Sequence, residues 1–321
     1  MHNLYLRPAS LPLEMNELRE VQQRVRQLAD DVNAVLLVHY YQTQDIQEVA
    51  DHLGDSLELA LQASRTDADV ILFAGVDFMA ETAKLVNPGK TVLHPNVRAQ
   101  CPMAAMVEPR ALRRVKQMNP DVPVVAYVNT SAAVKAESDI CCTSANAVSV
   151  VESLGADRIV FVPDTNLAFY VARQLPKVDV IPWPGYCHVH QNIKVEDVLD
   201  LQDMYPDAET LIHPEATPMV LTLADFVGST RGIAKRVSES PGREFIIGTE
   251  EGLTHHLRKL RPDAVFYVLP PGLCPNMKRI TITDILRSLE TMETQVEMDP
   301  DLVHRARSPV DRMLEIGRTS R

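Results

Sequence analysis

The chain has 321 residues, of which 45% are hydrophobic and 23% are charged, a composition typical of a globular protein and not of a disordered one. Its formal net charge of −11 and pI near 5.4 argue against a general nucleic-acid-binding or anionic-membrane-binding protein. No apolar run approaches the roughly 18 residues that span a bilayer, and the N-terminus lacks the features of a signal peptide, so a cytoplasmic protein is expected.

The first third of the chain predicts one helix followed by short apolar runs. The helix is expected over about 14–29, and the β-branched run after it ends in a polar pair, His39 and Tyr41. A turn carrying Ser56 comes next, then a second apolar run, and a third run leads to Cys101. Apolar runs alternating with helical segments are typical of βαβ units, whose parallel strands are buried on both faces.

The same features recur in the same order in the middle and last thirds of the chain. The members are Tyr127, Asn129, Ser144 and Cys187 in the middle third, and His213, Glu215, Ser229, Thr230 and Cys274 in the last third. Cys187 lies 86 residues after Cys101 and 87 residues before Cys274. This repeat of about 87 residues replaces the two domains of roughly 150 residues that the length alone suggests.

The repeat predicts an α/β fold of three αβα sandwich units with parallel sheets, related by a pseudo-threefold axis around a central cavity. We place the units at 14–104, 105–190 and 191–281, and we expect 282–321 to form a helical segment that packs back on the first unit. Ligands of parallel sheets bind beyond the carboxyl ends of the strands, so the polar pairs, hydroxyl turns and cysteines should converge on this cavity.

Three convergent thiolates suit a metal centre. A structural zinc site usually takes two of its four ligands from a local C-x₂₋₄-C pair, and this chain has no C-x-x-C. Three cysteines with one open position suit a [4Fe–4S] cluster, although buried free cysteines are the simpler alternative. The Rossmann, P-loop and nucleophile-elbow motifs are all absent from the sequence.

Several segments together resemble the quinolinate synthase family of bacterial NAD biosynthesis. They lie in order between about residues 36 and 285: V-H-Y-Y-Q, G-D-S-L, G-V-D-F-M-A-E, Y-V-N-T-S-A-A-V-K-A, D-I-C-C-T-S-A-N-A, H-P-E, G-S-T, I-I-G-T-E-E-G and C-P-N-M-K. The resemblance implies three α/β domains, one [4Fe–4S] cluster, and condensation of iminoaspartate with dihydroxyacetone phosphate to quinolinate, phosphate and two waters. The enzyme that supplies iminoaspartate is a further candidate partner, and neither nucleic acid nor membrane is expected as one.

The resemblance also assigns roles to individual residues. It makes Cys101, Cys187 and Cys274 the cluster ligands, and the remaining iron would act as a Lewis acid. We expect Glu215 to be the general base, with Tyr41 and His213 as further catalytic residues. The expected substrate-binding residues are His39, Tyr41, Ser56, Tyr127, Asn129, Ser144, His213, Glu215, Ser229 and Thr230. Spacing alone would equally allow His39 and His213 to be capped core histidines and Tyr41 a buried tyrosine.

Other residues near these motifs receive no ligand role. Cys141 and Cys142 are expected to pack at a helix N-terminus, and His188 and His190 to surround Cys187 without binding iron. Val268 and Pro271 stand where some family members carry extra cysteines, so the redox disulfide of those members is not expected. Two alternative functions remain: a non-enzymatic iron or oxygen sensor with the same cluster, and a zinc-stabilised scaffold.

Overall fold

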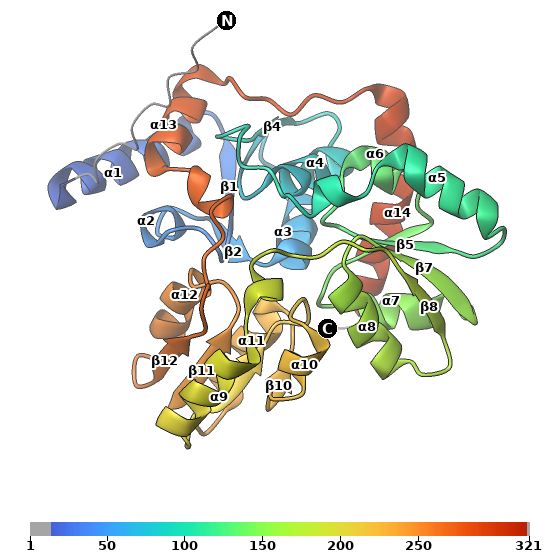
Figure 1. Cartoon of the computed structure of the whole chain (residues 1–321). Helices are drawn as coiled ribbons and strands as arrows, with labels where there is room; N and C mark the ends of the chain where they lie inside the picture. The colour runs from blue at the N-terminus through green and yellow to red at the C-terminus, as the bar shows by residue number, and fades with distance from the viewer. Residues whose placement is uncertain (1–13, 320–321) are drawn as a thin grey trace, which may run out of the picture.

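The computed structural model describes residues 14–319, and within that range it contains three parallel four-stranded sheets. Their strand orders are β2-β1-β3-β4, β6-β5-β7-β8 and β10-β9-β11-β12, so each unit repeats one topology. Figure 1 shows the three units grouped around a common centre. The predicted α/β class with three units is confirmed. The N-terminal 13 residues, on which the signal-peptide argument depends, and residues 320–321 lie outside the described range.

The first unit begins with the helix predicted over about 14–29, which extends slightly further. Its strands β1 and β3 are almost entirely buried because helices cover both faces of the sheet. Its elements are α1 (Met15–Asp31), β1 (Ala34–His39), α2 (Gln44–Gln47), β2 (His52–Gly54), α3 (Ser56–Ala63), β3 (Val70–Ala74), α4 (Asp77–Val86) and β4 (Thr91–Leu93).

The second and third units repeat this order, each opened by a 3₁₀ turn and a helix. The second contains η1 (Ala104–Met106), α5 (Pro109–Met118), β5 (Val124–Tyr127), α6 (Ala132–Lys135), β6 (Ile140–Cys142), α7 (Ala147–Ser153), β7 (Arg158–Val162), α8 (Thr165–Gln174) and β8 (Asp179–Pro182). The third contains η2 (His190–Asn192), α9 (Val195–Met204), β9 (Glu209–Ile212), α10 (Pro218–Leu221), β10 (Phe226–Val227), α11 (Thr230–Glu239), β11 (Glu244–Gly248), α12 (Leu253–Leu260), β12 (Val265–Val268) and η3 (Met277–Arg279).

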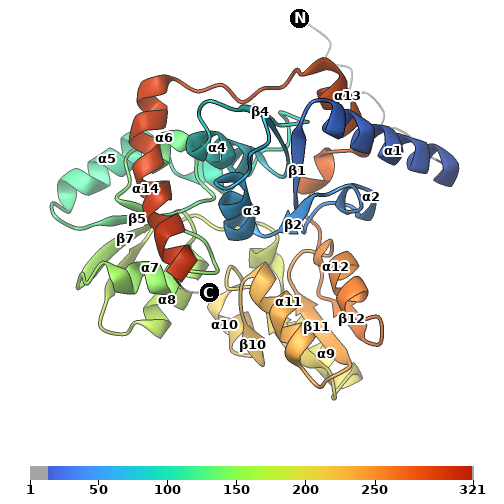
Figure 2. The same ribbon diagram turned by 180° about the vertical axis from the view of Figure 1, so that it is seen from behind.

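Two helices follow the third unit. Helix α13 (Ile282–Thr291) packs against α1 and β3 of the first unit. Helix α14 (Pro300–Thr319) contacts α3 and α4 of the first unit and also α6, α7 and β6 of the second, as Figure 2 shows from behind. Its buried residues Ala306, Val310 and Met313 belong to one hydrophobic core with both units. The C-terminal segment therefore joins two units, and the unit boundaries stay predictions.

The sequence did not indicate the short second strand of each sheet. These strands, β2, β6 and β10, have two or three residues and pair with one neighbour only, so they leave little hydrophobic pattern. Cys141 and Cys142 lie in β6, fully buried, and not at a helix N-terminus as expected. They act there as small apolar residues of the sheet.

Candidate active site

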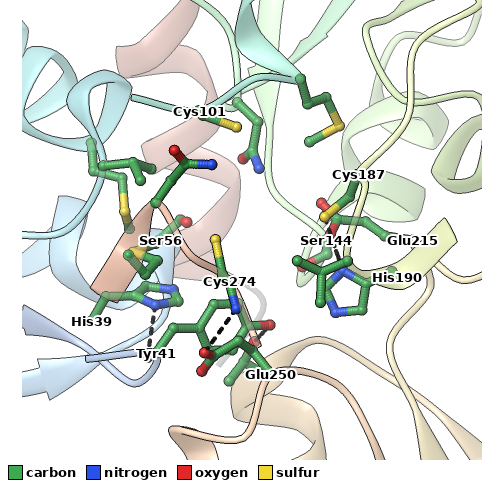
Figure 3. A pocket seen from close by; sticks show the side chains of 18 of the residues that line it. His39, Tyr41, Ser56, Cys101, Ser144, Cys187, His190, Glu215, Glu250 and Cys274 are labelled. Carbon is green, nitrogen blue, oxygen red and sulfur yellow. Dashed lines mark hydrogen bonds and ion pairs between the residues drawn. The ribbon is translucent and has the colours of Figure 1, made fainter. Parts of the chain in front are cut away.

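One cavity is lined by residues from all three units, at the carboxyl ends of the strands. Figure 3 shows the side chains that project into it. Of the predicted site residues, the lining includes Cys101, Cys187, Cys274, His39, Tyr41, Ser56, Tyr127, Asn129, Ser144, His213, Glu215 and Thr230. Ser229 is the exception: its hydroxyl caps α11 by accepting the Gly232 N–H at 3.1 Å.

The three cysteines project into this cavity from the three units (Figure 3), each from a loop that leads into a 3₁₀ turn. Burial raises the pKa of the Cys101 thiol to about 12, against the opposing effect of the Ala104 N–H. Burial likewise raises the pKa of Cys187 and of Cys274, and backbone N–H groups of the following turn oppose it in both. Buried thiols of this kind become thiolates where a metal centre balances their charge.

Each cysteine loop is held by a carboxylate that the sequence reasoning missed. The backbone N–H of Cys101 donates to Asp77, that of Cys187 to Asp164 and that of Cys274 to Glu250, each at 3.1 Å. The acids follow β3, β7 and β11 at intervals of 87 and 86 residues, which is the period of the cysteines. That shared period was the signal available in the sequence.

His39 and His213 occupy equivalent positions and have the same tautomer. In each, the ring Nδ1 accepts the backbone N–H of the residue two further on, Tyr41 at 3.1 Å and Glu215 at 3.3 Å. A neutral ring then carries its proton on Nε2. Burial lowers the pKa of both histidines to about 3, so both are neutral hydrogen-bond donors at physiological pH.

Glu215 is a buried carboxylate surrounded by histidines. Its Oε2 lies 2.7 Å from Nδ1 of His190, which also approaches the Cys187 sulfur at 3.3 Å. Burial alone would raise the pKa of Glu215, but the neighbouring His213 and His190 outweigh burial and hold this pKa below its usual range. Glu215 is therefore ionised. Its other oxygen, Oε1, has no hydrogen-bond partner at normal distance among the described residues, although the Tyr127 phenol is near enough to the carboxylate to help lower its pKa.

A chain of hydrogen bonds connects Glu215 to Tyr41. Nε2 of His190 lies 2.9 Å from the Thr249 hydroxyl, which lies 2.6 Å from the Tyr41 hydroxyl. Tyr41 also meets Thr230 at 2.9 Å. Burial, together with the Glu215 charge, raises the pKa of Tyr41 well above its usual value, so the phenol keeps its proton. His190 thus contacts both Cys187 and Glu215, and the chain can transmit a proton between Glu215 and Tyr41.

The remaining predicted residues lie around these groups. The Ser144 hydroxyl lies 3.1 Å from Nε2 of His213, and Ser56 is the first residue of α3. Tyr127 is buried beside Glu215, whose charge adds to burial in raising the pKa of the phenol. Oδ1 of Asn129 is buried without a hydrogen-bond partner among the described residues. Unpaired buried polar atoms on a cavity wall are suited to a polar ligand.

A second grouping offers metal ligands of another kind. Atoms of Cys187, His190 and Glu215 lie within 4.8 Å of one another and could together hold a single ion. The cavity therefore contains two overlapping donor sets, the three thiols and this mixed group.

Comparison with known proteins places the chain in one family. The profile described as "Quinolinate synthetase A protein" matches residues 23–315. Quinolinate synthase 1 of Methanosarcina acetivorans is 49% identical over 295 residues, which cover 92% of this chain and 97% of the relative. Quinolinate synthase of Aquifex aeolicus is 45% identical over 312 residues, which cover 95% and 97%. None of the described helices is long and apolar enough to cross a membrane.

Proposed function

Because the chain belongs to the quinolinate synthase family, we propose that it is a cytoplasmic, [4Fe–4S]-dependent enzyme that makes quinolinate for NAD biosynthesis. Its substrates would be iminoaspartate and dihydroxyacetone phosphate, and its products quinolinate, phosphate and water. The observation that supports this most strongly is the convergence of three thiols, one from each unit, on the cavity that also contains Glu215.

The donor set fits a [4Fe–4S] cluster. Cys101, Cys187 and Cys274 would hold it, since their thiols share the cavity and each is met by backbone N–H groups of the turn that follows. When bound, the cluster would supply one open iron as a Lewis acid for a substrate carboxylate or hydroxyl.

The protein side of the cavity suits anionic substrates. Neutral His39 would present its Nε2–H donor to a carboxylate or phosphate oxygen without adding charge. The Nε2–H of neutral His213 is directed at the Ser144 hydroxyl, which could pass a hydrogen bond on to the substrate. Ser56 is the first residue of α3 and would offer its hydroxyl to the substrate, since Asp55 already accepts the N–H groups of Leu57 and Glu58 at this helix start. Tyr127 and Asn129 would add hydrogen bonds that orient the carbon skeleton, and Ser144 and Thr230 would add hydroxyls.

Glu215 is the proposed general base. Its unpartnered Oε1 is free to accept a substrate proton, while Oε2 stays bound to His190. Its lowered pKa makes it a weak base in isolation, and a nearby anionic substrate would raise that pKa. The hydrogen bonds through His190 and Thr249 would hold the Tyr41 hydroxyl in place, and Tyr41 could donate its own proton to a developing alkoxide.

The mixed group of Cys187, His190 and Glu215 favours one competing candidate, an enzyme with a single bound metal ion. The cluster enzyme and the single-ion enzyme differ in the roles of Cys101 and Cys274. Both cysteines would bind the cluster, whereas a single ion at the mixed group would not need them as ligands.

Anaerobic purification followed by a quinolinate assay tests the proposal. We expect a brown protein with broad visible absorbance that forms quinolinate only when iminoaspartate and dihydroxyacetone phosphate are both present. A colourless protein that binds one metal ion and makes no quinolinate would refute the proposal in favour of the single-ion site.

A further inference from the structure

Two buried side chains outside the cavity wall occupy equivalent positions in the first two units. Gln47 ends helix α2 and Lys135 ends helix α6, and they lie 88 residues apart. The same 88 residues separate Tyr41 from Asn129. Gln47 is 6% exposed and Lys135 is 0% exposed. Long polar side chains are seldom buried so fully unless their polar atoms have specific hydrogen-bond partners.

Gln47 binds the main chain on both sides of Tyr41. Its Nε2 donates to the carbonyl of Tyr40 at 2.8 Å and to that of Gln42 at 2.9 Å. The same nitrogen lies 2.8 Å from the carbonyl of Gly252, in the third unit, so its two hydrogens are shared among three acceptors. The turn after β1 is therefore fixed to α2 and to the neighbouring unit.

Lys135 binds the main chain on both sides of Asn129 in the same way. Its Nζ donates to the carbonyl of Val128 at 2.9 Å and, by a shorter contact, to that of Thr130. The ammonium lies 5.6 Å from the centre of the Phe78 ring, and no carboxylate of the described residues lies in ion-pair contact with it. Burial lowers the pKa of Lys135, against the opposing effects of Cys141, Glu81 and Asp77. Because no carboxylate touches this buried charge, the two carbonyls are its direct hydrogen-bond partners.

In the third unit, a residue from a different helix binds the main chain at the equivalent position. Glu215 corresponds there to Tyr41 and Asn129, and the position equivalent to Lys135 is Leu221, which has no donor. Asn166, on α8, instead donates to the carbonyl of Glu215 at 3.0 Å. A buried donor thus holds the main chain at each of the three polar residues.

We propose that Gln47 and Lys135 are positioning residues that fix the turns after β1 and β5 so that Tyr41 and Asn129 face the substrate. Of the two residues, Lys135 is expected to have the larger effect on the position of the side chain that it supports. The Tyr41 hydroxyl is also held by Thr230 and Thr249, whereas Oδ1 of Asn129 has no partner within the described range and depends on its backbone. The kinetic consequence rests on the function proposed above, and the structural one does not.

The test compares Lys135→Met, Lys135→Gln and the matched control Leu221→Met. Methionine keeps the length of lysine but donates nothing, whereas glutamine performs this task in the first unit. We expect Lys135→Met to lower kcat/KM about a hundredfold, the cost of a displacement of about 1 Å in a binding group. Iron content and visible absorbance should stay unchanged, because Lys135 contacts none of the three cysteine loops by a hydrogen bond. Lys135→Gln should recover about tenfold or more of that loss, and Leu221→Met should match the wild type.

Hydrogen exchange supplies a readout that does not depend on activity. The Val128 N–H donates to the carbonyl of Cys142 at 2.9 Å, and it should exchange faster in Lys135→Met than in the wild type or in Leu221→Met.

Wild-type exchange at residues 127–131 together with wild-type kcat/KM in Lys135→Met would overturn the proposal. Equal kinetic losses in Lys135→Met and Lys135→Gln would also overturn it, since charge and not positioning would then be the cause. If Lys135→Met does not fold, Lys135→Gln is the test. Near-wild-type exchange with kcat/KM within about tenfold of the wild type supports the proposal, and a hundredfold loss contradicts it. A wild type that makes no quinolinate would refute the proposed function and leave the exchange result to be judged separately.

Discussion

Replacing Glu215 by glutamine removes the proposed base while keeping the shape of the side chain. The amide oxygen can take the place of Oε2 and keep the 2.7 Å contact with His190. The NH₂ group then occupies the place of Oε1, the oxygen left without a partner within the described residues. The substitution therefore turns the free acceptor into an uncharged donor.

The expected loss of activity follows from that change. General base catalysis contributes about 10²–10⁴-fold, so kcat should fall by this factor, equivalent to about 3–5 kcal/mol in activation free energy. Stability should change much less. A hydrogen bond to a charged group contributes about 1.5–3 kcal/mol and a neutral one about 1 kcal/mol, and the relief of burying a charge offsets part of the difference. The Tm should therefore shift by only a few degrees, on the order of 2–4 °C per kcal/mol.

The assay is quinolinate formation under anaerobic conditions, with iron content, visible absorbance and Tm measured on the same preparation. Glu215→Gln should keep the wild-type absorbance and lose turnover. Near-normal turnover in a variant with full iron content would eliminate Glu215 as the base. Loss of iron together with turnover would instead assign Glu215 to the metal centre, as the mixed group of ligands allows.

Three further predictions concern other parts of the site. Glu250→Gln removes one of the acceptors that hold the Cys274 loop, and it should weaken iron retention about 10–100-fold, measured as iron per chain after gel filtration with a chelator. His39 and His213 each have a pKa of about 3 in the folded protein, below the unfolded value of 6.5, so stability is intact above pH 6.5 and is lost as the pH falls toward 3, by up to about 1.4 kcal/mol per pH unit for each histidine. Urea unfolding at pH 7.5 and 5 measures this slope, and a variant His39→Asn with an unchanged slope would contradict it. Thr249→Val breaks the hydrogen-bond chain to Tyr41 and should lower kcat about 10–100-fold, whereas Thr249→Ser should stay close to wild type; equal rates in the two variants would remove the chain from the mechanism.

The sequence predicted the parts of the fold that bury apolar surface in a regular pattern. Strands such as β1 and β3 are β-branched runs covered on both faces, and their recurrence every 87 residues or so defines three units. The edge strands β2, β6 and β10 were not predicted, because two or three residues are too few to show an alternating hydrophobic pattern. The course of α14 over two units depends on long-range packing, which an amphipathic pattern does not specify.

In the candidate site too, residues with a regular spacing could be predicted, and contacts that depend on the fold could not. Residues that recur at one spacing, such as Cys101, Cys187 and Cys274, can be grouped from their positions in the chain, and the fold brings them to one cavity. The contact of His190 with Glu215 joins residues 25 positions apart in sequence, and no local motif indicates it. Ser229 is a predicted ligand because hydroxyls at helix starts either cap the helix or bind anions, and in this structure its hydroxyl caps α11.

We propose that quinolinate formation depends on one cluster held by three cysteines, one from each unit. Anaerobic measurement of iron, sulfide and quinolinate formation in Cys101→Ala, Cys187→Ala and Cys274→Ala tests it most directly. Each of the three variants is expected to lose the visible absorbance and all quinolinate formation, while Cys141→Ala retains both. Quinolinate formation by a cluster-free Cys274→Ala protein would contradict it.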